Sequence, residues 1–112
     1  MFEELQGEVE RDATTGPARV LRCARCDTAL ADAADVVPAS RRAYMNPHGY
    51  VREIVVVSRA RNLTGDGRRV AAFSWFPGHT WEIMCCAGCL GHVGWRFEGG
   101  SVFYGLLVEA LA

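Results

Sequence analysis

Four cysteines occur as two Cys-x-x-Cys pairs, Cys23 with Cys26 and Cys86 with Cys89. Thiolates at this spacing reach adjacent corners of a tetrahedron, so the two pairs together would complete a four-sulfur zinc site. A closed shell of this kind leaves no position for water, which predicts a structural metal. The pairs are farther apart than the roughly 15–20 residues of a compact zinc ribbon, so the ion must join distant parts of the fold. Four unligated thiols, or a redox pair among them, are the alternative.

A fifth cysteine, Cys85, adjoins Cys86. It could replace its neighbour as a ligand only at poor geometry, so we expect it to pack as a small apolar group. Five cysteines in a chain without a secretory signal favour metal binding over disulfides.

The three tryptophans of the chain, Trp75, Trp81 and Trp95, lie on short stretches near the second cysteine pair. If zinc draws these stretches together, the indoles can form the walls of a concavity for a flat, compact guest. The alternative is that all three belong to the core. Aromatic cages also bind ammonium groups, but strand alternation turns the nearby Glu82 away from Trp81. A neutral guest with amide edges therefore fits better than a cation.

Composition narrows the class of protein. The 112 residues suit one domain, and the formal net charge of −1 gives no reason to expect a nucleic-acid surface. Four thiolates around one Zn²⁺ would add a net charge of about −2, which disfavours polyanions further. No run approaches the roughly 18 apolar residues of a membrane span, and the acidic N-terminus is unlike a signal peptide. We expect a cytoplasmic monomer without membrane contact.

The elements that must position these residues are mostly short strands. Residues 1–17 form an acidic segment expected to be a flexible arm, and residues 18–112 form the folded domain. Residues 27–35 suggest a helical turn or loop, and the C-terminal residues 105–112 suggest a final helical turn. Turns are expected where Pro and Gly cluster, above all at Asn46-Pro47-His48-Gly49. Strands or extended segments are expected at residues 20–22, 36–38, 50–58, 70–73, 81–84, 92–97 and 102–104. The pattern predicts a mostly antiparallel β domain.

Several separated motifs resemble one known family. They are Asn46-Pro47-His48-Gly49-Tyr50, Ser74-Trp75-Phe76-Pro77-Gly78, Cys86-x-x-Cys89 and Gly94-Trp95-Arg96-Phe97, preceded by Cys23-x-x-Cys26. In this order they resemble the thalidomide-binding (CULT) domain of cereblon, over residues 20–111. The resemblance implies a β-tent, in which two antiparallel sheets meet at an angle and a four-cysteine zinc pins the apex.

The resemblance also implies a ligand. Trp75, Trp81 and Trp95 would form a tri-tryptophan pocket for a cyclic imide, which Phe97 would close. Family ligands are glutarimide rings of the thalidomide type, uracil-like rings and C-terminal cyclic imides on damaged proteins. Backbone groups at Phe73 and Trp75 would match the imide edge. The full set of implied binding residues is Trp75, Trp81, Trp95, Phe97, Phe73, Ser74, Asn46 and Pro47.

Two positions depart from the family pattern. Phe73 stands where eukaryotic cereblon has a histidine, so a side-chain bond would be lost there, and His79 stands where a tyrosine is expected. The chain shows no counterpart of the Lon-like domain or of the helical region that docks the ubiquitin-ligase adaptor. It therefore resembles the stand-alone bacterial members, for which no ligase role follows.

Three classes of function remain open at this point: a binding module, an enzyme and a protein-interaction module. The favoured one is a binding module without chemistry of its own, because His48, His79 and His92 are scattered and none adjoins an obvious nucleophile. A methionine sulfoxide reductase B-like enzyme would need Cys85, whose thiolate would lie beside a negatively charged cluster. A hydrolase would need an activated water, which a closed zinc site does not supply. A protein-interaction module of the yippee type shares the paired cysteines but would not need three exposed tryptophans.

Overall fold

A computed structural model describes residues 19–112 of the chain, so the predicted arm at residues 1–17 lies outside the described residues. These residues form two antiparallel sheets, one of two strands and one of six. The small sheet pairs β2 (Val20–Arg22) with β3 (Ala29–Asp32). The large sheet has the order β4-β5-β9-β8-β7-β6 and consists of β4 (Arg42–Met45), β5 (Val51–Val57), β6 (Leu63–Gly65), β7 (Thr80–Cys86), β8 (His92–Glu98) and β9 (Val102–Leu107).

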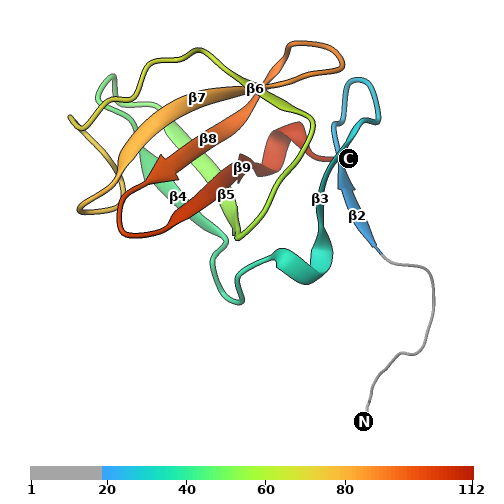
Figure 1. Ribbon diagram of the computed structural model, residues 1–112, viewed down its shortest axis with the longest axis horizontal. Helices are drawn as coiled ribbons and strands as arrows, with labels where there is room; N and C mark the ends of the chain where they lie inside the picture. The colour runs from blue at the N-terminus through green and yellow to red at the C-terminus, as the bar shows by residue number, and fades with distance from the viewer. Residues whose placement is uncertain (1–18) are drawn as a thin grey trace, which may run out of the picture.

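The small sheet lies at one end of the large sheet, beside the C-terminus (Figure 1). The end of the chain is paired with it: Leu111 forms a β-bridge with Cys23, and the Ala112 N–H donates to the Arg22 carbonyl at 2.9 Å. Two 3₁₀ turns, η1 (Ala33–Asp35) and η2 (Val108–Ala110), follow β3 and β9. The predicted class, a mostly β fold with two antiparallel sheets and a four-cysteine site, is confirmed.

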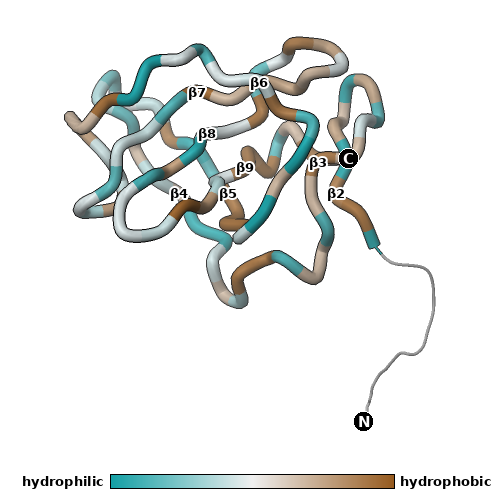
Figure 2. Tube along the Cα trace, viewed as in Figure 1, coloured by the Kyte–Doolittle hydropathy of each residue, from teal (hydrophilic) through white to brown (hydrophobic). Residues whose placement is uncertain are grey.

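Two hydrophobic clusters fill the molecule, and β9 contributes to both. Leu106 belongs to the cluster behind the cysteines, with Leu30, Val57 and Val93. Leu107 belongs to the second cluster, which contains most of the aromatic side chains. Adjacent residues of a strand point to opposite faces, so β9 can serve both clusters. Figure 2 shows hydrophobic residues gathered where β3, β5 and β9 approach one another, while the loops are more hydrophilic.

A β-bulge shapes the pairing of β7 with β8. Met84 is opposite Gly94 and Cys85 is opposite His92, so Val93 is an extra residue on β8. A bulge shifts the alternation of side chains along its strand. As a result Val93 packs in the cysteine-side cluster, while Trp95, two residues later, packs in the aromatic cluster.

Three sequence expectations need correction. Residues 70–73 are not a strand: Val70 makes a single bridge to Trp81, and Phe73 has φ = 61°, which an extended segment cannot contain. Residues 27–35 are not only a turn or loop, because Ala29–Asp32 is a strand that pairs with β2. The final strand runs to Leu107, and the predicted C-terminal helical turn is the 3₁₀ turn Val108–Ala110. Four predicted segments are strands, at 20–22, 50–58, 81–84 and 92–97. Their predicted ends differ from the observed ends by two residues at most.

Candidate functional site: a cysteine cluster and an aromatic cavity

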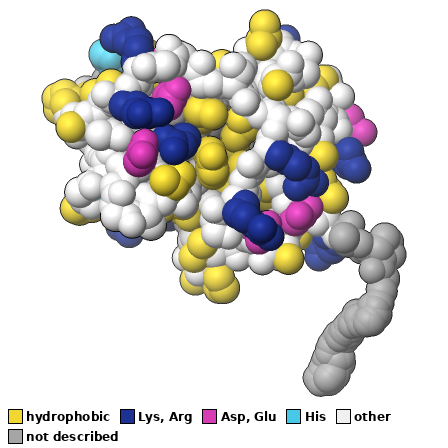
Figure 3. All heavy atoms as spheres, in the orientation of Figure 1, with side chains coloured by type: hydrophobic (Ala, Val, Ile, Leu, Met, Phe, Trp, Pro, Cys, Tyr) yellow, Lys and Arg dark blue, Asp and Glu magenta, His cyan; other side chains and the backbone are white. Residues whose placement is uncertain are grey.

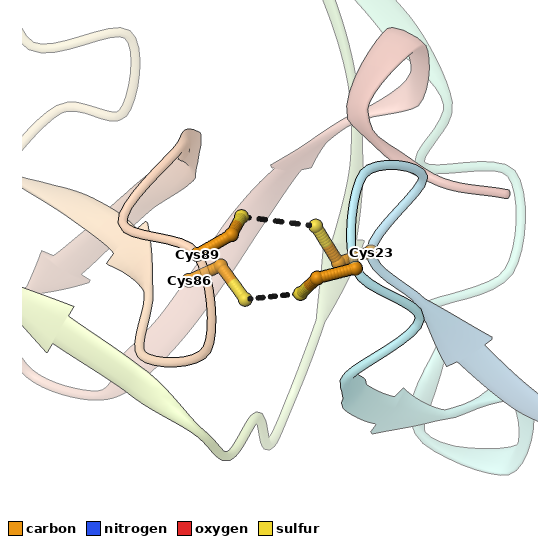
Figure 4. Close-up of side chains that lie close together, drawn as sticks. Cys23, Cys86 and Cys89 are labelled. Carbon is orange, nitrogen blue, oxygen red and sulfur yellow. Dashed lines mark hydrogen bonds between the residues drawn. The ribbon is translucent and has the colours of Figure 1, made fainter.

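Two turns bring the four cysteines of the Cys-x-x-Cys pairs together. The turn after β2 carries Cys23 and Cys26, while Cys86 is the last residue of β7 and Cys89 lies in the turn after it. The sulfur of Cys23 lies 3.7 Å from that of Cys89, and the sulfur of Cys26 lies 3.5 Å from that of Cys86. Figure 4 shows Cys86 and Cys89 facing Cys23 across the space between the turns. All four sulfurs lie within 4.8 Å of one another.

These distances fit zinc. Sulfurs at about 2.3 Å from a tetrahedral zinc are about 3.8 Å apart, close to the two measured separations. Hydrogen bonding to Thr28, whose hydroxyl lies 3.1 Å from the Cys26 sulfur, lowers the pKa of Cys26 to about 6. A backbone hydrogen bond from Gly91 lowers the pKa of Cys89, but burial and hydrogen bonds with the other cysteines outweigh it and raise the pKa to about 11. Zinc binds thiolates, so metal binding would release the proton that Cys89 holds. The four sulfurs fill all corners, and the zinc is structural.

Cys85 lies beside this cluster but outside it. It is half-buried within β7, where its backbone is opposite Thr64 and His92. Its side chain does not line the cavity described next.

An aromatic cavity of about 260 Å³ lies against strands β5, β7 and β8 of the large sheet. Its walls come from β5, β7, β8, the β4–β5 turn and the loop before β7. The lining residues are Asn46, Pro47, His48, Arg52, Phe73, Trp75, Trp81, Ile83, His92, Trp95 and Phe97.

Strand register explains why Trp81 and Trp95 line the same cavity. Trp81 of β7 is opposite Phe97 of β8, and Ile83 is opposite Trp95, so these four side chains form a block on one face. Opposite Trp95 on β9 is Gly105, which has no side chain to cover the block. The sheet thus supplies a flat aromatic floor.

Trp75 comes from the loop before β7 and stands across this floor. Its ring centroid is 4.9 Å from that of Trp95, at an interplanar angle of 70°. It also stacks on Tyr44, at 5.1 Å and 17°. Edge-to-face and stacked pairs are the favoured aromatic geometries, so these two contacts hold the Trp75 ring in place.

Hydrogen bonds fix two of the indoles further. The Trp75 Nε1–H donates to the Met45 carbonyl at 3.0 Å, and the Trp81 Nε1–H donates to the Ala72 carbonyl at 2.7 Å. These donors are therefore used within the protein and present the guest with ring surface rather than N–H groups. A guest's polar edge must be matched by other groups.

The β4–β5 turn, which Pro47 and Gly49 predict, lies along one rim of the cavity. The Asn46 side-chain oxygen accepts from the backbone N–H groups of His48 and Tyr50, at 3.0 and 2.9 Å. Gly49 has φ = 89°, which glycine adopts readily. This Asx-type turn holds Asn46, Pro47 and His48 beside the indoles.

Two basic side chains lie against Trp95. The Arg52 guanidinium carbon is 5.6 Å from the indole centroid, and its Nη2 donates to Glu109 at 3.2 Å. The His92 ring meets Trp95 edge-to-face at 4.8 Å, and its Nε2 lies 3.0 Å from the Gly94 carbonyl. Burial lowers the pKa of His92 below its ordinary value, and the charge on Arg52 lowers it further. The neutral imidazole therefore donates from Nε2, because a carbonyl can only accept.

Of the eight residues that the resemblance implied, seven line the cavity; Ser74 does not. Its hydroxyl is turned to its own loop, donating to the Phe76 carbonyl at 3.0 Å. Sequence reasoning did not select His48, Arg52, Ile83 or His92 as site residues. Ile83 could have been found from alternation with Trp81, and His48 from its place in the turn. His92 could not, because only the bulge at Val93 brings it to the side of Trp95.

Charged side chains elsewhere are paired rather than gathered by sign. Arg96 contacts Glu98 at 2.8 Å, and Arg61 contacts Asp32 at 3.0 Å. On the face shown in Figure 3, basic and acidic side chains surround a central hydrophobic area in mixed groups. Within residues 19–112, no helix is long and apolar enough to cross a membrane.

A small β domain held by a four-cysteine zinc site and carrying an aromatic cavity defines the class of this protein, and comparison with known families agrees. Residues 19–101 match the family model described as Yippee zinc-binding/DNA-binding /Mis18, centromere assembly. The chain belongs to this family. The predicted zinc cofactor is thereby confirmed by both family and geometry.

The chain is also similar to protein cereblon of several animals. It is 42% identical to the protein of Danio rerio over 102 residues, 43% to that of Gallus gallus over 75 residues, and 36% to that of Drosophila erecta over 96 residues. These matches cover 81%, 62% and 75% of this chain but 24%, 17% and 16% of the relatives. The chain is thus a cereblon-like domain that spans a quarter or less of these relatives. Its assignment to the stand-alone bacterial type stays a prediction.

Proposed function

We propose that this domain is a binding module for small cyclic imides and uracil-like rings, held between Trp75, Trp81 and Trp95. The observation that carries the proposal is the aromatic cavity itself. Its volume of about 260 Å³ lies just below the roughly 300–1,000 Å³ usual for drug-sized ligands, which favours a single-ring guest. Walls at a steep angle to each other, fixed by hydrogen bonds, form a preorganised slot for a flat ring.

The polarity of the cavity supports a guest with an imide edge. An imide presents acceptor, donor and acceptor, and the indole N–H groups of Trp75 and Trp81 are already used. Backbone groups of the loop that contains Phe73 and Trp75 would then match this edge. Among residues 19–112 no Asp or Glu lines the cavity, which disfavours the cationic guests that other aromatic cages bind. The nearby Glu82 is buried elsewhere, where it accepts from the Gly67 N–H at 2.9 Å.

The same lining supports binding without catalysis. It contains no Ser, Thr, Cys, Asp, Glu or Lys, so the usual nucleophiles and carboxylate bases are missing from it. His92 is neutral and has one nitrogen occupied by the Gly94 carbonyl. The zinc, with four sulfur ligands, has no open position to activate water. We therefore propose no reaction for the domain.

Fluorescence titration tests the proposal directly, since all three tryptophans of the chain would touch the guest. Glutarimide, thalidomide or uracil should quench the emission in a saturable way. Trp81→Ala should weaken binding about 10- to 100-fold, the usual cost of removing one aromatic stacking surface. Val102→Ala, which removes an exposed hydrophobic side chain outside the lining, is the control and should leave affinity unchanged. No saturable response at millimolar ligand would refute the proposal.

Exposed hydrophobic side chains around the mouth favour a guest that is attached to a polypeptide. Phe73 is 72% exposed, and Met45, Tyr50 and Val51 of the β4–β5 hairpin are 63%, 68% and 62% exposed. Such a rim would contact residues that precede a C-terminal cyclic imide. A peptide ending in the cyclic imide should bind at least about tenfold more tightly than the same peptide ending in the open-chain amide. Equal affinities would instead favour a yippee-type protein-interaction surface that does not use the cavity.

A further inference from the structure

The side chains of the cavity lining that can carry charge are all basic. They are Arg52, His48 and His92, and no acidic side chain lines the space among residues 19–112. A ring bound by its imide edge needs none of them. Their presence on one side of an aromatic slot indicates a second, anionic feature of the guest.

Of these three side chains, Arg52 is the one that carries a full charge and is also packed against the rest of the protein. It lies on β5 opposite Tyr44, and its side chain is only 25% exposed. Its guanidinium faces the ring of Trp95. Placing a cation on an aromatic inner face removes part of its hydration, which is unfavourable unless an anion or hydrogen-bond acceptors replace the water.

Besides the contact with the Trp95 ring, the protein supplies only a weak replacement. The partner carboxylate, Glu109, is 72% exposed, and a surface pair of this kind contributes little. A guanidinium has five N–H donors, and within residues 19–112 the bond to Glu109 uses only Nη2. Donors on Nε and Nη1 remain for another acceptor, and planar guanidinium groups bind carboxylates through two parallel bonds.

We infer that the guest of this cavity is a cyclic imide or uracil-like ring that carries a carboxylate, and that Arg52 binds this carboxylate as a specificity-determining residue. The inference rests on the proposed function, because it names a substituent of the ring that the tryptophans hold. His92 assists only by packing, since it is neutral, so the charge that selects the anion comes from Arg52.

Acid and amide pairs of the same shape test the charge separately from the ring. The first pair is orotate and orotamide, in which the charged group is attached directly to a uracil ring. The second is N-succinyl-3-aminoglutarimide and its terminal carboxamide, in which it is farther from the ring. The readout is the ratio of the Kd of the amide to the Kd of the acid, from titration of the zinc-loaded protein. In the native protein at least one pair should give a ratio of about 10 or more, falling as salt is added.

A matched pair of variants assigns the effect. Arg52→Met should bring the ratio to about 1. Arg42→Met is the control, because the Arg42 guanidinium also lies over an aromatic ring, that of Tyr44 at 5.4 Å, yet does not line the cavity; its ratio should match that of the native protein. Zinc content and near-ultraviolet circular dichroism verify folding, and Arg52→Gln replaces Arg52→Met if the latter loses zinc.

The outcomes separate this inference from the proposed function. If the amides bind but neither acid binds more tightly, the inference is wrong and the imide pocket stands. If the acids are preferred but Arg52→Met keeps that preference, another group selects the anion and the assignment of Arg52 is wrong. If neither the four compounds nor uracil and glutarimide bind, the proposed function is wrong. The inference is then wrong as well, because it depends on that function.

Discussion

Phe73 combines an unfavourable backbone conformation with an exposed aromatic side chain. Its φ of 61° lies in the left-handed region, and its ring is 72% exposed while lining the cavity. A bulky residue in this region costs roughly 1–2 kcal/mol, and burial of the ring provides little compensation. A strained residue at the mouth of a cavity is consistent with a role in contacting the guest.

This strain can be measured. We expect Phe73→Gly to exceed Phe73→Ala in free energy of unfolding by about 1 kcal/mol, because only glycine adopts positive φ without cost. Both variants lose the ring, so both should bind a cyclic imide less tightly than the native protein. Denaturant titration of the two zinc-loaded variants gives the difference. If Ala and Gly are equally stable, the backbone at this position is not strained in solution.

At the scale of the elements, the contact of β8 with β9 decides where the aromatic floor lies. Gly94 follows the bulged residue Val93, and a Cβ at Gly94 would overlap the backbone carbonyl of Gly105. A Cβ at Gly105 would lie 2.7 Å from the Ile54 Cδ1 atom, which is the end of a flexible side chain. The two strands can approach this closely only because Gly94, which is opposite Leu106, has no Cβ.

Gly94→Ala should therefore destabilise the domain by about 1–3 kcal/mol, the usual cost of forcing atoms into a filled site, because the overlapping atom is backbone that cannot rotate away. Gly100→Ala is the control, since a Cβ there has open space and Gly100 has no positive φ. Thermal or denaturant unfolding of the zinc-loaded proteins measures the effect. Equal stability of the two variants would contradict the close approach of β8 and β9.

At the scale of the whole molecule, zinc connects the two sheets. Cys23 and Cys26 follow the small sheet's first strand, while Cys86 ends β7 of the large sheet and Cys89 follows it. Beneath the cluster, Leu30 and Val57 pack in the same core. The domain is small, and a cavity interrupts its aromatic cluster. Because the hydrophobic core is limited, we expect the metal to supply a large part of the stability that holds the two sheets together.

Removing the metal should abolish cooperative unfolding. Zinc binding in structural sites of this kind contributes roughly 10–16 kcal/mol in small peptides, which is as large as the roughly 5–15 kcal/mol stability of a typical domain. Chelation, or Cys26→Ser, should remove one zinc per chain by metal analysis and eliminate the thermal transition. Cys85→Ser is the control and should retain both zinc and the transition, because Cys85 lies outside the cluster. Loss of zinc from Cys85→Ser would mean that Cys85 is a ligand.

The sequence by itself determined the chemistry of the metal and the class of the fold. Paired cysteines can be recognised without coordinates because the two-residue spacing is a local property of a turn. Strands are predicted equally well, because the apolar run Ile54–Val57 and the alternating segments of β7 and β8 are also local sequence patterns. The Asn46–Gly49 turn follows from Pro and Gly chemistry and is present as expected.

Only the tertiary structure decided which side chains surround the cavity. Arg52 reaches Trp95 through the pairing of β5 with β9 and β9 with β8, which no local pattern specifies. His92 reaches the same indole because of a bulge, and Phe73 adopts positive φ, which is rare for phenylalanine. Such features arise from contacts between residues distant in the sequence, where packing overrides local preference. They are also the features that give the cavity its shape and its charge.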